Sequence, residues 1–348
     1  MATLYNIHER TMNNEIKRYK DYSLLAHNTF GMDVRCKCFI EYYSAQQLQL
    51  LVPSLSRPFL HIGGGSNLLF SSDYAGTILH SAIKGISRLG EDGEGHVLVK
   101  AGAGEIWDDL VAWAVDSGLG GIENLSLIPG EVGASAVQNI GAYGVEAKDV
   151  IVCVDVVDLS TGEARQLTNA DCHYSYRQSI FKNELKGRYA ITHVTYALSA
   201  TPQLQLDYGN IRAALSGRSD VTVADVRRAI IDIRNAKLPD PSVMGNAGSF
   251  FMNPIVDSST FEALRGVYPD MPFYVVGDRY KIPAGWMIEK CGWKGKALGR
   301  AGVHDKQALV LVNLGGATSE EIMRLCEAVR KDVKKTFGVD IHPEVNII

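Results

Sequence analysis

The sequence predicts an α+β protein of more than one domain. Stretches rich in β-branched residues dominate the middle of the chain, and strongly amphipathic helices dominate its last third. This mixture is typical of the α+β class. At 348 residues the chain also exceeds the length that one hydrophobic core usually organises, so we expect two or three domains.

The first two thirds of the chain are predicted to hold short strands and two helices. A polar leader over residues 1–20 is a candidate for disorder and lacks the apolar core of a signal peptide. The second helix carries Ile106, Leu110, Trp113 and Ala114 on one face. The expected elements are a helix at 44–52, strands at 59–62, 77–80 and 96–100, a helix at 105–116, and strands at 150–159 and 189–198.

The last third is predicted to hold two capped helices and a terminal strand. The pattern changes near 216–221, and capping boxes at 222–225 and 318–321 each precede an apolar stripe. A final strand at 339–345 should return to an existing sheet, because an isolated strand would leave its backbone polar groups unsatisfied. The two stripes are Val226, Ile230 and Ile233, and Ile322, Leu325, Val329 and Val333.

Composition excludes several classes of function. A formal net charge of -4 argues against bulk binding to nucleic acid or anionic membranes, and no apolar run approaches the roughly 20 residues of a membrane span. The six cysteines include no Cys-x-x-Cys pair, so we expect reduced thiols and a cytoplasmic location. The nine histidines show no metal-ligand spacing, and we expect no metal.

Two glycine-rich segments could hold a ligand. Gly63 to Asn67 follows a strand, and its consecutive backbone N–H groups suit a pyrophosphate, although a plain turn between strands is the alternative. Residues 129–144 are mostly small, which lets a long ligand lie against bare backbone or lets two elements pack closely. Neither the Gly-x-Gly-x-x-Gly nor the P-loop signature occurs. Two separated cradles suit a dinucleotide better than a mononucleotide.

Three polar side chains are candidates for chemistry. Ser249 lies among glycines and is followed by Phe250 and Phe251, which could exclude water; a tight packed turn fits equally well. Arg177 and Glu344 are flanked by aromatic or apolar residues and should be partly buried. From the residues alone, each is best interpreted as a member of an unrelated structural ion pair.

An ordered set of motifs resembles those of the UDP-N-acetylenolpyruvoylglucosamine reductases, also called UDP-N-acetylmuramate dehydrogenases. The resemblance covers about residue 24 to the end, and its specificity comes from the order of the whole set. The motifs are NTFG at 28–31, GGGSNLL at 63–69, IPG at 128–130, QNIGAYG at 138–144, YRQSIF at 176–181, KLPDP at 237–241, GSFF at 248–251, AGW at 284–286 and PEV at 343–345.

The resemblance implies an FAD-binding fold of the vanillyl-alcohol-oxidase and p-cresol-methylhydroxylase type over 21–201, in two α+β subdomains split near residue 85. An α+β substrate-binding domain would follow over 215–335, and a terminal strand over 339–348 would return to the FAD-binding part with Glu344. No His stands in the 63–67 loop, so FAD should be non-covalent. The implied FAD contacts are Gly63, Gly64, Gly65, Ser66, Asn67, Leu68, Ile128, Pro129, Gly130, Ser135, Gln138, Asn139, Gly141, Ile191 and Arg234.

The resemblance also implies the reaction, which is reduction of UDP-N-acetylglucosamine enolpyruvate to UDP-N-acetylmuramate for peptidoglycan. Hydride would pass from flavin N5 to the vinyl carbon, Arg177 and Glu344 would stabilise the enolate, Ser249 would donate the proton, and NADPH would reload the flavin. Glu344 would act in a protonated or proton-sharing state. Tyr208 is similar to the substrate-loop tyrosine of the longer subclass, and a monomer is expected. The implied contacts of the uridine diphosphate portion are Lys237, Asn253, Tyr274, Lys294 and Gln307.

Three other functions remain open from the sequence. A flavin oxidase on the same fold would act on a hydroxyl substrate. A serine hydrolase would use Ser249, although no Gly-x-Ser-x-Gly elbow surrounds it. A non-catalytic module would bind a UDP-sugar without flavin. One departure from the family pattern is Asn346, which stands where members often carry a basic residue.

Overall fold

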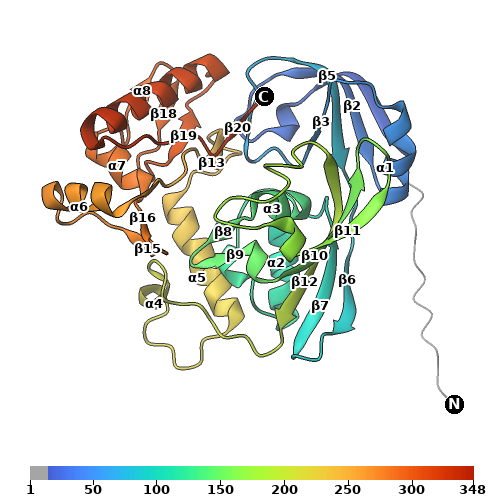
Figure 1. Cartoon of the computed structure of the whole chain (residues 1–348), viewed down its shortest axis with the longest axis horizontal. Coiled ribbons are helices and arrows are strands. Elements are labelled where there is room, and N and C mark those ends of the chain that lie inside the picture. The colour runs from blue at the N-terminus through green and yellow to red at the C-terminus, as the bar shows by residue number, and fades with distance from the viewer. Residues whose placement is uncertain (1–14) are drawn as a thin grey trace.

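The computed structural model describes residues 15–348 and arranges them around three main sheets (Figure 1). Residues 1–14 of the predicted leader lie outside the described residues. Its expected boundary at residue 20 is wrong, because β1 (Lys17–Ser23) pairs antiparallel with β2 (Arg35–Tyr42). β1 is an exposed edge strand with a polar sequence, so neither hydrophobicity nor alternation marks it.

The first sheet has the order β1-β2-β5-β3, with parallel pairing of β2 to β5 and of β5 to β3. The parallel neighbours require crossovers, and α1 (Ala45–Leu51) lies in the first of them. Its Leu48 packs with Ile40 and Leu79 in the core of this sheet. The other strands of the region are β3 (Phe59–Ile62), β4 (Leu68–Leu69) and β5 (Tyr74–Ser81).

The second sheet is antiparallel, with the order β11-β10-β12-β7-β6, and it begins at Ile86, soon after β5 ends. Helices α2 and α3 bury Leu110 and Val132 in the core beneath it. The elements are β6 (Ile86–Glu91), β7 (His96–Gly102), α2 (Trp107–Asp116), α3 (Val132–Gln138), β8 (Gly141–Ala142), β9 (Val145–Glu146), β10 (Ile151–Asp158), β11 (Ala164–Thr168) and β12 (Tyr189–Ser199).

The C-terminal region has a four-stranded sheet, β13-β19-β18-β17, and a smaller one, β14-β16-β15. The long helix α8 covers the first of these and buries Ile322, Leu325 and Val329 (Figure 1). Among the described helices, none is long and apolar enough to cross a bilayer. The elements are α4 (Ile211–Ala214), α5 (Val223–Lys237), β13 (Asn246–Ser249), β14 (Ile255–Val256), α6 (Ser258–Val267), β15 (Tyr274–Val276), β16 (Arg279–Lys281), α7 (Ala284–Lys290), β17 (Ala297–Leu298), β18 (Ala301–Val303), β19 (Val310–Asn313), α8 (Ser319–Phe337) and β20 (Asn346–Ile347).

The terminal strand lies later than predicted. Residues 339–345 are not a strand; Val339, Ile341 and Val345 are buried in the C-terminal core as irregular chain. Side-chain and loop partners satisfy this backbone: Arg330 Nε donates to the Ile341 carbonyl at 2.8 Å. The chain then forms β20, which pairs parallel with β4. The C-terminus thus returns to the N-terminal part of the chain that holds the first sheet, and Figure 1 shows its red end beside the blue strands.

The predicted apolar face of α2 is only partly correct. Leu110 and Ala114 are fully buried, but Ile106 is the N-cap residue and remains 49% exposed. Trp107 is buried instead, and its indole N–H donates to the Leu125 carbonyl at 2.9 Å. The helix therefore begins after Ile106, so that residue never joins the helical stripe.

Candidate active site

A cavity of about 1010 Å³ lies where the two N-terminal sheets and the C-terminal region meet. This volume is at the upper end of the range for small-molecule sites. Both glycine-rich segments contribute to its wall, together with residues 177–191 and the C-terminal tail. Predicted site segments that are far apart in the sequence therefore line the same cavity.

The first glycine-rich segment forms a cradle because side chains do not fit there. Gly65 has φ +71°, and a Cβ at this position would lie 1.9 Å from the His27 carbonyl oxygen. A Cβ on Gly63 would lie 3.2 Å from a carboxylate oxygen of Glu131. The second segment touches the first, since Ser66 Oγ donates to the Pro129 carbonyl at 3.0 Å. Bare backbone from both segments is thus exposed to one ligand.

Two buried donors at this cavity have no hydrogen-bond partner within residues 15–348. They are Thr29 Oγ1 and Arg234 Nε, and both residues line the cavity. Burial lowers the pKa of Arg234, while Tyr143 and Asp108 act in the opposite direction. A buried unpaired guanidinium nitrogen is costly, so this part of the cavity is suited to an anionic or acceptor-rich ligand.

Arg177 and Glu344 form a direct ion pair in the cavity wall. Arg177 Nε lies 3.1 Å from Glu344 Oε1, and the two side chains are only 18% and 12% exposed. Gln138 Nε2 donates to the same carboxylate oxygen at 2.8 Å. Arg177 Nη2 donates to the Gly141 carbonyl at 2.5 Å. The alternative of two unrelated ion pairs is therefore wrong, because the tail carries Glu344 onto Arg177.

Ser249 ends β13 and is exposed on the cavity wall, beside Gly248 with φ +67°. No described residue makes a hydrogen bond to its hydroxyl. Phe250 and Phe251 do not line the cavity, so the expectation that they shield the site is wrong: they are 0% and 1% exposed and belong to the C-terminal core. In that core Phe250 packs against Phe30, with ring centroids 6.1 Å apart.

Most of the predicted cofactor contacts line this cavity, but Asn139 does not. Asn139 is fully buried, and its amide nitrogen donates to Glu146 at 3.1 Å and to the Ser175 carbonyl at 2.9 Å. Its side chain therefore organises the loop behind the wall. The lining residues among the predicted set are Gly63, Gly64, Gly65, Ser66, Asn67, Leu68, Ile128, Pro129, Gly130, Ser135, Gln138, Gly141, Ile191 and Arg234.

The predicted substrate contacts divide into three groups. Tyr208, Lys237 and Gln307 line the cavity. Tyr274 stacks on Tyr208 with ring centroids 5.6 Å apart. The other two face different partners.

Asn253 and Lys294 do not line the cavity. Asn253 Nδ2 lies 3.4 Å from Tyr176 Oη, and its Oδ1 accepts from the Ala284 N–H at 2.9 Å. Lys294 forms an ion pair with Glu289 at 3.1 Å. Asn253 is therefore one layer behind the wall, and Lys294 would have to leave Glu289 to reach a ligand.

Two polar groups at the site were not predicted. Lys182 lines the cavity and donates to the Arg177 carbonyl at 2.8 Å. Glu131 lies against the cradle and accepts from His80 at 2.9 Å. The signal for Lys182 was present, because it directly follows the YRQSIF motif. No sequence signal pairs Glu131, the N-cap residue of α3, with His80 in β5.

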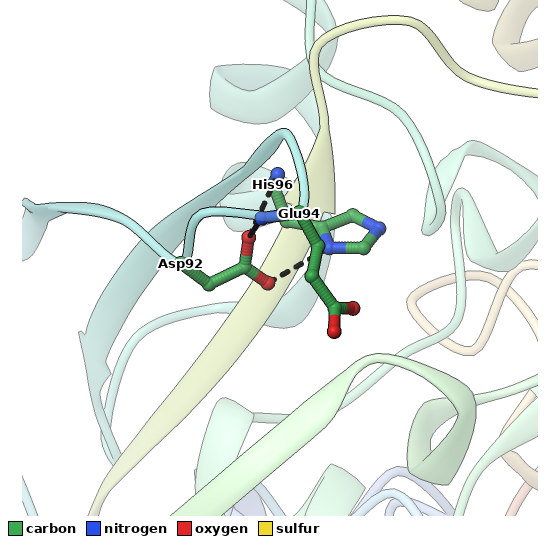
Figure 2. A group of neighbouring side chains, drawn as sticks. All are labelled: Asp92, Glu94 and His96. Atoms are coloured by element: carbon green, nitrogen blue, oxygen red, sulfur yellow. Dashed lines mark hydrogen bonds and ion pairs between the residues drawn. The ribbon is translucent and has the colours of Figure 1, made fainter.

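Among the described residues, three surface side chains each have one potential metal-ligand atom within 4.8 Å of the others. They are Asp92, Glu94 and His96 (Figure 2). Asp92 Oδ1 accepts from the backbone N–H groups of Glu94 and His96, at 2.8 and 3.1 Å, and Oδ2 lies 2.8 Å from His96 Nδ1. These contacts organise the turn between β6 and β7, and the group does not line the cavity.

The fold and the cavity together define a class of protein. Residues 38–168 match the family model described as "FAD binding domain". This range contains the glycine cradle, β3 and β5 of the first sheet, and β6, β7, β10 and β11 of the second. The donors and bare backbone of the cavity fit such a ligand: the cradle could hold the pyrophosphate, and Arg234 offers an unpaired cationic donor. The chain is an FAD-dependent oxidoreductase, and its expected α+β FAD-binding fold is confirmed.

The particular family follows from the rest of the chain. Residues 240–348 match the model described as "UDP-N-acetylenolpyruvoylglucosamine reductase, C-terminal domain". The chain is 57% identical to the UDP-N-acetylenolpyruvoylglucosamine reductase of Bacteroides fragilis, over 94% of this chain and 99% of the relative. It is 45% identical to that of Flavobacterium johnsoniae, over 94% and 98%. The chain therefore belongs to the UDP-N-acetylenolpyruvoylglucosamine reductases.

A solved structure agrees at the level of the fold. The UDP-N-acetylenolpyruvylglucosamine reductase of Thermus caldophilus superimposes with a TM-score of 0.67 at 20% identity, covering 96% of this chain and 98% of that chain. The likeness spans both sheets of the FAD-binding part and the C-terminal region.

Proposed function

We propose that this enzyme reduces UDP-N-acetylglucosamine enolpyruvate to UDP-N-acetylmuramate with NADPH, in cytoplasmic synthesis of peptidoglycan precursors. Family membership supports the reaction class. The observation that carries the assignment of residues is the Arg177–Glu344 pair in the same cavity wall as the exposed hydroxyl of Ser249. FAD, when bound without a covalent link, supplies the hydride.

Arg177 and Glu344 would hold the pyruvyl carboxylate and stabilise the negative charge that develops on it. Arg177 keeps its orientation through Glu344 and the Gly141 carbonyl, so little reorganisation is needed when charge develops. Glu344 Oε1 accepts from Gln138 and Arg177, whereas no described residue donates a hydrogen bond to Oε2. We propose that Oε2 is the atom through which Glu344, in a protonated or proton-sharing state, forms a hydrogen bond to the substrate.

Ser249 would hold the proton that the adjacent substrate carbon receives. A serine hydroxyl is a weak acid, so it can serve only a strongly basic carbon. Its exposure to the cavity, with no protein acceptor among the described residues, leaves the O–H free to point at substrate and open to reprotonation by water.

The nucleotide portion would extend toward the C-terminal region. Tyr208, Lys237 and Gln307 already line the cavity, and Tyr274 backs Tyr208. Lys294 would join them by exchanging its Glu289 partner for a ligand phosphate or base. We propose that NADPH uses the same cavity in alternation with the substrate, and that the enzyme acts as a monomer.

Replacing Ser249 by Ala tests this assignment. We expect NADPH to bleach the yellow flavin of the variant at the wild-type rate, while reoxidation by the enolpyruvyl substrate slows by a factor on the order of 100 or more. Anaerobic stopped-flow absorbance measures both half-reactions, and Ser219→Ala, at an exposed surface site, is the control. An equal loss in both half-reactions would exclude Ser249 as proton donor.

The same measurements separate the other functions. A flavin oxidase would consume oxygen rapidly with an alcohol and would not reoxidise with the enolpyruvyl ether. A UDP-sugar-binding module would bind its ligand without flavin. A serine hydrolase needs a base at Ser249, but no histidine within residues 15–348 makes a hydrogen bond to its hydroxyl. If Ser249 nevertheless served a hydrolase reaction, Ser249→Ala would leave both flavin half-reactions intact.

A further inference from the structure

Arg177 occupies a backbone conformation that its side chain disfavours. Ser175 and Gln178 exchange two backbone hydrogen bonds, at 3.1 and 2.9 Å, so Tyr176 and Arg177 form the tip of a two-residue turn. Arg177 has φ +56°, in the left-handed region where a Cβ crowds the backbone of any non-glycine residue. A strained residue persists only where its surroundings fix it.

Lys182 supplies such a contact. Its ammonium donates to the Arg177 carbonyl at 2.8 Å, and no other side chain among the described residues donates to that oxygen. A charged donor makes a stronger hydrogen bond than a neutral one. The backbone of Lys182 is fixed in turn, since its N–H donates to the Ser179 carbonyl at 3.1 Å. The turn tip and the segment that follows it are therefore joined through one side chain.

The charges around Lys182 agree with a role on the backbone. Burial lowers the pKa of Lys182; Glu344 acts to raise it, and Arg177 and Lys186 lower it further. Lys182 makes no ion pair with Glu344, although both line the cavity. The carboxylate is already occupied by Arg177 and Gln138, which leaves the Arg177 carbonyl as the partner of the ammonium.

We propose that Lys182 is a positioning residue for the substrate half-reaction: its ammonium holds the strained turn of Arg177 and thereby aims the guanidinium at Glu344 and the substrate carboxylate. The proposal rests on the function proposed above for Arg177. It assigns Lys182 no contact with flavin or NADPH. Its loss should therefore affect one half-reaction only.

The experiment compares three variants of the flavin-loaded enzyme. Lys182→Met keeps the length of the side chain and removes the donor, and Lys182→Arg restores a cationic donor. Lys331→Met removes an equal charge from an exposed position of α8 that does not line the cavity. Stopped-flow absorbance gives the rate of flavin reoxidation against substrate concentration and the rate of reduction by NADPH, and quenching of flavin fluorescence gives the Kd for FAD.

We expect Lys182→Met to lower the limiting rate of reoxidation roughly 10- to 100-fold, because a small misplacement of an oriented group has this effect. The substrate concentration at half-maximal rate, the reduction rate and the Kd for FAD should change little. Lys182→Arg should recover most of the loss. Lys331→Met should change reoxidation by about twofold or less, because an exposed charge away from the cavity is screened.

Three results would overturn the proposal: Lys182→Met matching Lys331→Met, a loss shared by both half-reactions, or weaker FAD binding as the main effect. Failure of the underlying function looks different, because wild-type enzyme would then not be reoxidised by the enolpyruvyl substrate at all. If wild type reoxidises and Ser249→Ala does not, while Lys182→Met behaves as wild type, only the role of Lys182 is excluded.

Discussion

At the residue scale, the pKa values of two histidines in contact are shifted in opposite directions. The rings of His27 and His80 lie 5.2 Å apart. Burial lowers the pKa of His80, but the hydrogen bond with Glu131 and the charges of Glu131 and Glu41 outweigh burial, so the net shift is upward. His80 lies 2.9 Å from Glu131 and 3.5 Å from Glu41, the latter without an aligned hydrogen bond. Burial, and next the charge of His80, lower the pKa of His27 to about 4.

The neutral state of His27 predicts a specific loss of stability in acid. With a pKa of about 4 in the folded chain and near 6.5 in the unfolded chain, His27 takes up a proton preferentially on unfolding. Stability should therefore fall as the pH drops from 6.5 toward 4. After a discount for partial exposure, we expect His27→Phe to remove about 1–2 kcal/mol of this fall.

Urea unfolding of the apo-protein at pH 7 and pH 4.5 measures this effect, with His342→Gln at an exposed position as the control. If His27→Phe and wild type lose the same free energy of unfolding between the two pH values, His27 is not the titrating group.

The site shows which residues a sequence can identify. Ser249, Arg177 and Glu344 stand in motifs with distinctive neighbours, and their positions were predicted. Their contacts were not, because the Arg177–Glu344 pair depends on a tail that returns across the whole molecule. Asn139 stands in a motif as clearly as Gln138 does, yet its amide binds the loop behind the wall. A motif gives the position of a side chain and not the direction in which it points.

At the element scale, local signals at helix ends predicted the structure best. The capping boxes at Thr222 and Thr318 are both present, and α8 ends at Gly338 with φ +70°. These signals depend on residues within one turn, so tertiary context does not change them. The strand predicted at 339–345 failed because this segment makes only an isolated bridge, between Pro343 and Phe251, while its apolar residues pack in the C-terminal core.

The cap of α8 leads to a prediction of stability. Thr318 Oγ1 accepts from the Glu321 N–H at 3.3 Å, and Glu321 accepts from the Thr318 N–H at 3.0 Å. We expect Thr318→Ala to lower the free energy of unfolding by about 1 kcal/mol. The exposed mid-helix variant Lys331→Ala should change it by about 0.5 kcal/mol or less. Chemical denaturation measures both, and equal values for the two variants would exclude a contribution from the cap.

At the scale of the whole molecule, the C-terminal tail joins the unit that carries Ser249 to the unit that carries the glycine cradle. Glu344 donates its N–H to the Phe250 carbonyl at 2.8 Å, directly after Ser249. Asn67, in the cradle, donates its side-chain N–H to the Glu344 carbonyl at 3.3 Å. One residue thus contacts the segment that follows Ser249, the cradle and Arg177, and its position depends on how the tail is fixed.

Deleting residues 346–348 should loosen this junction without unfolding the protein. The deletion removes β20, in which Asn346 and Ile348 donate backbone N–H groups to the carbonyls of Asn67 and Leu69 at 3.0 and 2.9 Å. The cradle loop then loses its partner strand, and we expect the Kd for FAD to rise roughly tenfold, equivalent to about 1.4 kcal/mol.

The point variant Asn346→Ala is the control. It keeps the backbone pairing and loses one side-chain contact with the Asn67 carbonyl at 3.3 Å, so it should bind FAD almost as wild type does. Quenching of flavin fluorescence gives the Kd, and thermal unfolding of the apo-protein shows whether the fold survives. If the deletion binds FAD with wild-type affinity, β20 does not hold the cradle; if Asn346→Ala weakens binding as much as the deletion does, the side chain and not the strand pairing is responsible.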